Sequence, residues 1–364
     1  MRVMTILGTR PEIIRLCRTI PKLDAACEHV LVHTGQNYDP RLSEIFFQEL
    51  GVRPPDRILG VRGDSPGAIM AEVLVKCEAV LNEFKPDRLL ILGDTYSGLS
   101  AIVARRMGVP VYHMEAGNRC FDFRVPEEAN LRIIDHMSTV LMPYTERSRA
   151  NLVREGFAAE RVYVTGNPIK EVIDSFSTRI AASPALQDAG VESGRYFLLT
   201  MHRAENVDDP SRLAALFDGM SQAAKHYGMP IVCSLHPRTR ERLREFKIEL
   251  SRAEFLISEP FGFFDFIHLE QNALCVISDS GTVQEETCIL GVPNVTIRDV
   301  TERPETVECG SNVLSGAEPR HLLASIALVT GTKPRWRAPA EYLATDVSDV
   351  VTRIMINRLP SPRG

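Results

Sequence analysis

Short apolar runs alternate with helical patterns along almost the whole chain, and this alternation limits the folds open to it. Repeated units of this spacing form parallel sheets that are covered by helices on both faces. We therefore predict an α/β protein with two Rossmann-like, doubly wound parallel-sheet domains. The predicted strands are 2–8, 28–33, 88–92, 109–114, 138–142 and 161–165, then 196–201, 231–235, 254–258, 274–278 and 293–297. The predicted helices are 11–24, 41–50, 66–84, 96–107, 126–136, 145–155 and 168–180, then 211–226, 238–247, 264–271, 282–290, 317–329 and 339–358.

The length of the chain favours two domains, because 364 residues are more than one core usually supports. Residues 181–195 are rich in Ala, Ser, Pro and Gly, and we predict that they form the linker. The N-terminal domain then covers 1–180 and the C-terminal domain covers 196–338. The final segment, 339–364, is expected to form a helix that packs back toward the N-terminal domain. Two halves of similar size imply an interdomain cleft, where small molecules often bind.

Composition argues against several classes of partner. A net charge of −5 without a basic block argues against nucleic acid, and no apolar run approaches the roughly 18 residues that would span a membrane. Eight scattered cysteines without a CxxC pair favour a reduced setting, and the N-terminus lacks a secretory pattern, so a cytoplasmic location is expected. Metal-ligand spacing, a P-loop and a GxGxxG fingerprint are all missing, so we predict neither a metal nor a dinucleotide cofactor.

Three carboxylates lie within residues 93–132, where an α/β fold places functional groups. Asp94 follows the run 88–92, Glu115 follows 109–114, and Glu127 opens a helix. Because ligands of open α/β sheets bind beyond the carboxyl ends of the strands, the three acids are candidates for proton transfer. Helix capping by Asp94 and a favourable helix-end charge at Glu127 are the structural alternatives, whereas Glu115 caps nothing obvious. Burial of all three together would raise at least one pKa and make a proton donor.

A candidate anion-binding segment is the sequence SDSGTVQEE at 278–286. It follows a predicted strand and starts a helix, so hydroxyl and backbone N–H groups gather at a helix N-terminus, which suits a diphosphate. These groups belong to Ser280, Gly281 and Thr282. Glu285 and Glu286 lie in the first turn, where a glutamate either accepts hydrogen bonds from ribose hydroxyls or completes a capping box.

Basic residues follow three other strands. GTRPE at 8–12 opens the first helix, and Arg10 is expected to point from its start into the cleft, with an exposed turn arginine as the alternative. His202 and Arg203 follow the strand 196–201, where His202 either donates to a diphosphate or transfers a proton, or is simply structural. His236 in LHPRTR is a weaker candidate of the same kind.

Two further loops are candidates for holding a sugar or a phosphate. RDVTERPE at 298–305 places Arg303 and Glu305 around a proline, with surface ion pairs as the alternative. HTGQNYD at 33–39 follows the second strand. Its residues Gln36, Asn37 and Tyr38 either bind sugar hydroxyls or shape the loop.

The ordered motifs GTRPE, GDT, MEAG, PEEAN, TGNP, HRAEN, SDSG-QEE and RD-TERPE together resemble the non-hydrolysing UDP-N-acetylglucosamine 2-epimerase family, over residues 1 to about 355. The resemblance implies two Rossmann-like domains of the GT-B type with the active site in the cleft, no cofactor, and a homodimer. It also implies inversion of carbon 2 of a UDP-N-acetylhexosamine, through UDP elimination to a glycal and re-addition. The residues that it implicates are Asp94, Glu115 and Glu127 for proton transfer, Arg10, His202, Ser280, Gly281 and Thr282 for the diphosphate and for charge on departure, Glu286 for ribose, and Arg303 and Glu305 as a frame.

Some positions depart from the family pattern. Asn37 stands where substrate-activated members carry histidine, which puts such activation in doubt, and Arg15 stands where lysine is frequent. The QNYD and GNRCFD variants resemble the branch that acts on modified sugars, such as the 6-deoxy sugar that leads to UDP-N-acetyl-L-fucosamine. UDP-N-acetylglucosamine remains the leading substrate. The alternatives are a hydrolysing 2-epimerase that releases N-acetylmannosamine and UDP, a UDP-dependent glycosyltransferase, and a non-catalytic nucleotide-sugar sensor.

Overall fold

Each half of the chain forms a six-stranded parallel sheet, and the two sheets have the same strand order. In the computed structural model, which describes residues 1–35, 40–331 and 335–357, the first sheet has the order β3-β2-β1-β4-β5-β6 and the second β9-β8-β7-β10-β11-β12. The paired strands are parallel throughout. In both sheets the first strand lies in the middle and the chain winds outward in both directions, as in a Rossmann fold. The predicted pair of doubly wound α/β domains is confirmed.

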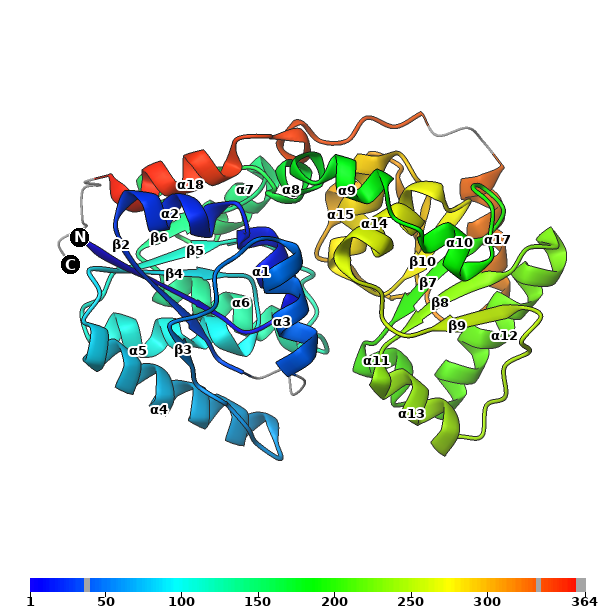
Figure 1. Ribbon diagram of the computed structural model, residues 1–364, viewed down its shortest axis with the longest axis horizontal. Helices are drawn as coiled ribbons and strands as arrows, with labels where there is room; N and C mark the ends of the chain where they lie inside the picture. The colour runs from blue at the N-terminus through cyan, green and yellow to red at the C-terminus, as the bar shows by residue number, and fades with distance from the viewer. Residues whose placement is uncertain (36–39, 332–334, 358–364) are drawn as a thin grey trace. The chain divides into compact units, whose positions relative to one another are not determined.

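The first sheet and its flanking segments come from the N-terminal half and the last residues of the chain (Figure 1). The elements in order are β1 (Arg2–Leu7), α1 (Arg10–Leu16), α2 (Thr19–Ala26), β2 (Glu28–His33), α3 (Pro40–Glu49), β3 (Arg57–Ile58), α4 (Pro66–Phe84), β4 (Arg88–Leu92), η1 (Tyr96–Leu99), α5 (Ser100–Arg106), β5 (Val111–Met114), α6 (Pro126–Met137), β6 (Val140–Met142), α7 (Glu146–Arg154), η2 (Ala159–Arg161), α8 (Ile169–Ser175), η3 (Ala340–Leu343) and α18 (Val347–Ile356).

The second sheet is built in the same manner. Its elements are α9 (Ser177–Ala181), α10 (Ala185–Ala189), β7 (Phe197–Met201), α11 (Ala204–Val207), α12 (Pro210–Tyr227), β8 (Ile231–Leu235), α13 (Pro237–Glu245), β9 (Phe255–Ser258), α14 (Phe263–Asn272), β10 (Cys275–Ser278), α15 (Gly281–Leu290), β11 (Asn294–Thr296), α16 (Pro304–Glu308), β12 (Asn312–Leu314) and α17 (Pro319–Thr330).

The chain divides into two compact units. The first unit contains Met1–Val172 together with the residues from Glu341 onward, and the second contains Ile173–Ala340. Helix α18 packs beside α2 in the first unit, and the Glu171 carboxylate accepts a 2.9 Å hydrogen bond from the backbone N–H of Ser348 (Figure 1). The division lies before residues 181–195, which form the short helix α10 and other parts of the second unit.

Local sequence accounts for the long helices. Asp209 caps α12 by accepting from the backbone N–H of Ser211 at 2.8 Å and of Arg212 at 3.1 Å, Pro210 fills the first turn, and Gly228 ends the helix at a φ of 61°. Helix α4 begins in the same manner, with Ser65 as the cap and Pro66 behind it. The strands between such helices are almost entirely buried.

Several predicted boundaries were wrong. Residues 161–165 form no strand. They follow the edge of β6 with a single bridge between Leu141 and Val162, because β6 itself has only three residues. The predicted helix 11–24 is two helices, and the strands β3 and β12, with two and three residues, were missed because neither is long enough to show a period. Among the described residues, no helix is both long and apolar enough to cross a membrane.

The strand order defines a special position in each unit. In the first sheet the winding direction reverses between β1 and β4, and in the second it reverses between β7 and β10. Loops that follow neighbouring strands at such a point diverge to opposite faces and leave a crevice at the carboxyl edge, where α/β folds bind ligands. The loops at these points carry GTRPE and GDT in the first unit, and HRAEN and SDSG in the second.

Candidate functional site

Glu115 lies at the carboxyl end of β5, where a network of side chains holds its carboxylate. Its backbone has a φ of 67°, an uncommon conformation for a residue with a side chain. The side chain is buried, and Oε2 accepts from Arg15 Nη1 at 2.5 Å and from the Tyr144 hydroxyl at 3.3 Å. Asn118 Nδ2 donates to Oε1 at 3.4 Å. A strained backbone and three donors fix this acid in one orientation, which is what a positioned proton-transfer group needs.

Asp94 lies on the neighbouring loop, one residue after Gly93. A Cβ at Gly93, whose φ is 75°, would lie 3.6 Å from Glu115 Oε2, so the loop backbone runs directly beside that carboxylate. His113 Nε2 contacts the Gly93 carbonyl oxygen at 2.9 Å, and Asn130 Nδ2 donates to the Asp94 carbonyl oxygen at 2.9 Å. The structure thus brings the loop of Asp94 next to Glu115.

A buried carboxylate, Asp135, stands behind this loop. It contacts His113 Nδ1 at 2.8 Å and accepts from Arg119 Nη2 at 2.7 Å and from the Gly117 backbone N–H at 3.2 Å. Burial works to raise the pKa of Asp135, but the hydrogen bonds and charges of His113 and Arg119 outweigh burial, and the pKa is lowered. Asp135 therefore orients both the Gly93 loop and the turn after Glu115.

The GTRPE loop is tied to the same place by Glu12, a residue that sequence reasoning did not single out. The Glu12 carboxylate is buried and accepts from the backbone N–H of Gly8 at 3.0 Å, from Thr9 Oγ1 at 2.7 Å and from Ser97 Oγ at 2.5 Å. Burial raises the pKa of Glu12 even though these donors oppose it. Thr9 three residues before Glu12 is a capping-box spacing, which is the signal that would have identified it.

Arg10 begins α1 and is partly buried. Its guanidinium carbon lies 5.7 Å from the centre of the Phe46 ring, and burial lowers its pKa. Arg10 is therefore not the exposed turn arginine that was considered as the alternative. The residues Gln36, Asn37 and Tyr38, proposed for sugar hydroxyls, lie outside the described residues.

Glu127 lies in the first turn of α6 and is partly exposed, whereas the next residue is not. Glu128 is fully buried and accepts from the backbone N–H of Cys120 at 2.8 Å and from Arg132 Nε at 2.9 Å. Glu128 therefore fixes the loop before α6, whereas the Glu127 side chain is partly exposed at the start of the helix. Asn130 of the same helix binds the Asp94 loop, so the elements that carry Asp94, Glu115 and Glu127 are directly connected.

The second unit has a comparable arrangement around Asp279, which lies between β10 and α15. This fully buried carboxylate accepts from the backbone N–H groups of His202 at 3.1 Å and Arg203 at 3.0 Å, and from Asn206 Nδ2 at 3.1 Å. His202 Nδ1 lies 3.4 Å from Asp279 Oδ1, and 44% of the His202 side chain is exposed. Asp279 thus holds the loop after β7 and leaves the His202 ring accessible.

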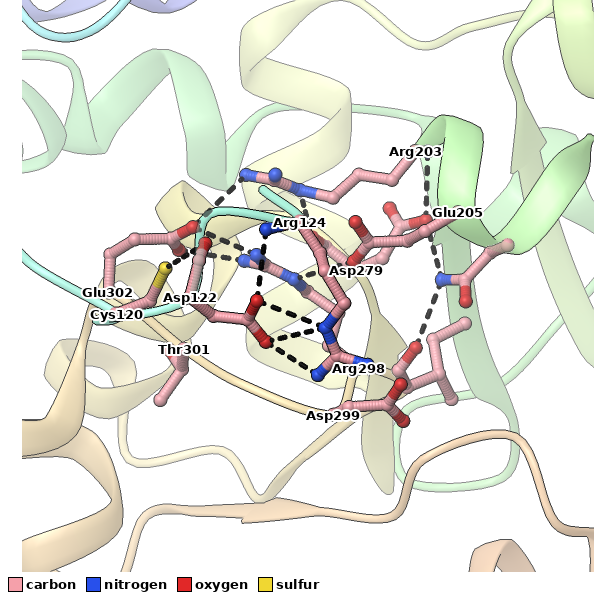
Figure 2. A network of polar contacts seen from close by, with 12 residues as sticks. Cys120, Asp122, Arg124, Arg203, Glu205, Asp279, Arg298, Asp299, Thr301 and Glu302 are labelled. Carbon is pink, nitrogen blue, oxygen red and sulfur yellow. Dashed lines mark hydrogen bonds and ion pairs between the residues drawn. The ribbon is translucent and has the colours of Figure 1, made fainter. Parts of the chain in front are cut away.

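Arg298 lies beneath this loop, fully buried, between two carboxylates (Figure 2). It binds Glu302 through two hydrogen bonds of 2.7 and 2.8 Å and Glu205 through a third of 3.1 Å. Burial alone would raise the pKa of Glu302, but the bonds from Arg298 and the charges of Arg203 and Arg303 lower it to about 2. Glu302 is therefore ionised, and it holds the arginines around it in place.

The start of α15 carries the candidate diphosphate groups. Ser280 is the N-cap residue, and its hydroxyl lies 3.0 Å from that of Thr282. A Cβ at Gly281 would lie 3.7 Å from the guanidinium carbon of Arg303, so the arginine lies against the helix start. Arg303 is buried and its Nε bonds to Glu285 of the same helix. A helix N-terminus with an adjacent guanidinium is a strong anion site.

The remaining candidates occupy neighbouring positions. Glu286 is buried in α15 and its carboxyl group interacts with the fully buried Glu270 of α14. Glu305 lies in the first turn of α16, two residues after Arg303. His236 caps α13 by accepting from the Arg238 backbone N–H at 3.3 Å, and its ring centre is 6.3 Å from that of His202. Within the described ranges, no group of three or more His, Cys, Asp or Glu side chains is placed to hold a metal ion.

Comparison with known proteins gives a consistent picture. The family model described as UDP-N-acetylglucosamine 2-epimerase matches residues 21–355. The UDP-N-acetylglucosamine 2-epimerase of Methanocaldococcus jannaschii is 39% identical over 348 residues, which cover 93% of this chain and 95% of that protein. The UDP-2,3-diacetamido-2,3-dideoxy-D-glucuronate 2-epimerase of Pseudomonas aeruginosa is 38% identical over 326 residues, which cover 87% and 89%. The crystal structure of the M. jannaschii UDP-GlcNAc 2-epimerase in complex with UDP-GlcNAc and UDP superposes with a TM-score of 0.92 at 37% identity, covering 98% of this chain and 99% of that chain.

Proposed function

The chain belongs to the UDP-N-acetylglucosamine 2-epimerase family, and on this basis we propose that it inverts carbon 2 of a UDP-N-acetylhexosamine by eliminating UDP and adding it back. The observation that carries the proposal is the fixed carboxylate of Glu115 at the carboxyl end of β5, beside the loop of Asp94 that follows the neighbouring strand β4. Exchange of a carbon-bound proton needs a rigidly held acid or base, and the fixed orientation of Glu115 supports this assignment.

The first unit supplies proton transfer in this proposal. A carboxylate removes the proton at carbon 2 as UDP leaves carbon 1, and a second acid group returns a proton to the opposite face of the glycal. We assign these steps to Asp94, Glu115 and Glu127, without an order among them. Arg15 and Tyr144 hold Glu115 in place for its step.

The second unit binds the leaving UDP. Its diphosphate gains negative charge as the bond to carbon 1 breaks, and preorganised donors stabilise such charge most effectively. Ser280, Gly281 and Thr282 offer the start of α15, and Arg303 lies against it. The accessible His202 donates from the neighbouring loop. Arg10 also binds the diphosphate. His236, whose ring lies near that of His202, contributes to binding of the substrate. The ribose hydroxyls bind Glu286, while Glu305 frames the nucleotide site.

UDP-N-acetylglucosamine is the substrate we propose first. A 2-epimerase for a diacetamido-dideoxyglucuronate is nearly as similar to this chain as one for UDP-N-acetylglucosamine, which favours a modified sugar as the second candidate. A small panel of UDP-sugars that differ at carbons 3, 4 and 6 separates the two, by the ratio of kcat/KM.

The decisive experiment follows deuterium uptake at carbon 2 by NMR in heavy water, with the UDP-sugar and no acceptor. Wild-type enzyme should exchange this position and produce the 2-epimer. Glu115→Gln should lower turnover by about two to four orders of magnitude, the usual cost of a lost acid or base, while UDP still binds. The matched control is Glu146→Gln, whose side chain is 64% exposed, and it should leave turnover unchanged.

Three results would contradict the proposal. Lasting accumulation of free sugar and UDP as the main products would indicate the hydrolysing reaction. A complete lack of deuterium uptake with every UDP-N-acetylhexosamine would favour a glycosyltransferase. Full turnover by Glu115→Gln would remove that residue from the reaction.

We also propose that the protein acts as a homodimer in the cytoplasm. Sedimentation equilibrium should then give twice the mass of one chain, and fractionation should recover the protein with the soluble cytoplasmic fraction.

A further inference from the structure

Cys288 and Cys309 place their sulfur atoms 3.6 Å apart in the second unit, and both are free thiols. Cys288 is buried near the end of α15, and Cys309 is half-buried directly after α16. A disulfide needs a sulfur–sulfur distance of about 2.05 Å, so the two atoms must approach by about 1.5 Å. Side-chain rotation at the end of a five-residue helix can supply much of this movement.

The two thiols differ in their chemistry. The two sulfur atoms are in hydrogen-bond contact, and this contact lowers the pKa of Cys309 to about 6, whereas the same contact and burial raise the pKa of Cys288. The hydroxyl of Ser311 lies 3.4 Å from the Cys309 sulfur. A thiolate that is partly accessible next to a resolving thiol is the arrangement found in redox-sensitive cysteine pairs.

We propose that Cys288 and Cys309 are a redox-active dithiol, which hydrogen peroxide oxidises to an intramolecular disulfide and small thiols restore. The Cys309 thiolate attacks one peroxide oxygen, the O–O bond breaks, and hydroxide leaves and takes up a proton to become water. This gives a sulfenic acid. The Cys288 sulfur then attacks the Cys309 sulfur, the S–O bond breaks, and the hydroxyl leaves with the Cys288 proton as a second water.

The position of the dithiol connects it to the nucleotide-binding segment. Helix α15 carries Glu285 in its middle and Cys288 three residues later, and α16 lies between Arg303 and Cys309. The ion pair of Arg303 with Glu285 joins α15 to the start of α16, and the disulfide would join α15 to the end of α16. Oxidation therefore clamps the segment that we assign to UDP. We expect UDP affinity to fall at least about threefold, a consequence that rests on the proposed function.

A built-in reporter lies at the site. Trp336 is the single tryptophan of the chain, and its Nε1 donates to the Cys288 carbonyl oxygen at 3.1 Å. Formation of the disulfide should therefore quench or shift tryptophan fluorescence, and dithiothreitol should reverse the change.

The test treats the purified full-length protein with hydrogen peroxide under native conditions. The count of free thiols should fall from eight to six, and the intact mass should fall by about 2 Da. Cleavage after glutamate separates residues 287–302 from 309–318, so the disulfide appears as one cross-linked peptide that dithiothreitol splits. Cys288→Ala should instead leave a sulfenic acid on Cys309, which dimedone traps. Cys27→Ser, at another partly buried cysteine, is the control and should form the same cross-link as the wild type.

The outcomes separate the two parts of the inference. Absence of the cross-linked peptide at peroxide concentrations that oxidise a half-buried thiol would overturn the dithiol. So would equal dimedone labelling of Cys309 in the wild type and in Cys288→Ala. Formation of the disulfide with unchanged UDP affinity would overturn only the link to nucleotide binding. The cross-link does not depend on activity, so it holds or fails independently of the proposed reaction.

Discussion

The ion pair of Arg298 and Glu302 predicts a specific dependence of stability on pH. The pKa of Glu302 lies at about 2 in the folded protein and near 4.5 when the chain is unfolded. A pKa difference of that size corresponds to about 3 kcal/mol of folding free energy. Because the folded-state pKa is the lower one, this stabilisation is present above pH 4.5 and is lost as the pH falls from 4.5 toward 2.

The Glu302→Gln variant separates this effect from other acid effects. The substitution leaves the Arg298 guanidinium buried with one partner fewer, which should cost about 3–5 kcal/mol at pH 6. It also removes the titrating group. The difference in unfolding free energy between wild type and variant should therefore shrink as the pH falls from 6 to the lowest accessible pH, by most of the roughly 3 kcal/mol that Glu302 contributes.

Urea unfolding followed by tryptophan fluorescence measures this gap, since Trp336, the single tryptophan, lies in the second unit with Glu302. The control is Glu192→Gln in the same unit, whose side chain is 84% exposed, and its curve should follow the wild type at every pH. A gap between wild type and Glu302→Gln that stays constant from pH 6 to pH 3 would refute the reasoning.

Four further substitutions test other parts of the structure. Gly117→Ala, at a φ of 79°, would place a Cβ 2.4 Å from a backbone oxygen of α7, so unfolding free energy by circular dichroism should fall by about 2–4 kcal/mol. Gly156→Ala, at a φ of 96° but facing open space, should cost only about 1 kcal/mol. Asp279→Asn should lower the unfolding free energy by about 2–3 kcal/mol and raise the KM for the UDP-sugar, because a neutral amide holds three donors poorly; an unchanged KM would argue against its positioning role. Burial, and then the Glu286 carboxyl, raise the pKa of Glu270, so wild-type stability should fall as the pH rises above 4.5; Glu270→Gln should lack that fall and be the more stable protein at pH 7.

The sequence predicted the positions of the site residues better than their partners. Glu115 and His202 follow apolar runs, and the carboxyl end of a strand is visible in one dimension. Arg15 was noted only as a departure from a family pattern. Its contact with Glu115, 100 residues away, depends on how α1 lies over the sheet, which no local pattern encodes. Short edge strands were missed for a similar reason, because two or three residues show no period.

Asp279 illustrates the same limit. It stands inside a motif that was recognised for its helix start, yet its role appears only when β7 and β10 are known to be neighbours. Three donors from the loop after β7 then converge on it. The order of the strands depends on packing across the whole second unit. The sequence pattern alone therefore identifies the motif but not the role of Asp279 as a hydrogen-bond acceptor.

In both units a buried carboxylate orients the loops at the switch point of the sheet. At the switch point of the first sheet, the buried Glu12 accepts hydrogen bonds from its own loop and from the loop after β4. At that of the second sheet, the buried Asp279 accepts them from the loop after β7. In both cases the buried acid orients the loop backbone, and the neighbouring side chains, Arg10 and His202, are partly exposed. Burial of a carboxylate at a strand end is therefore no sign by itself that it transfers protons. Glu115 differs because its donors are side chains and its own backbone is strained, so the fold holds the carboxylate itself in place.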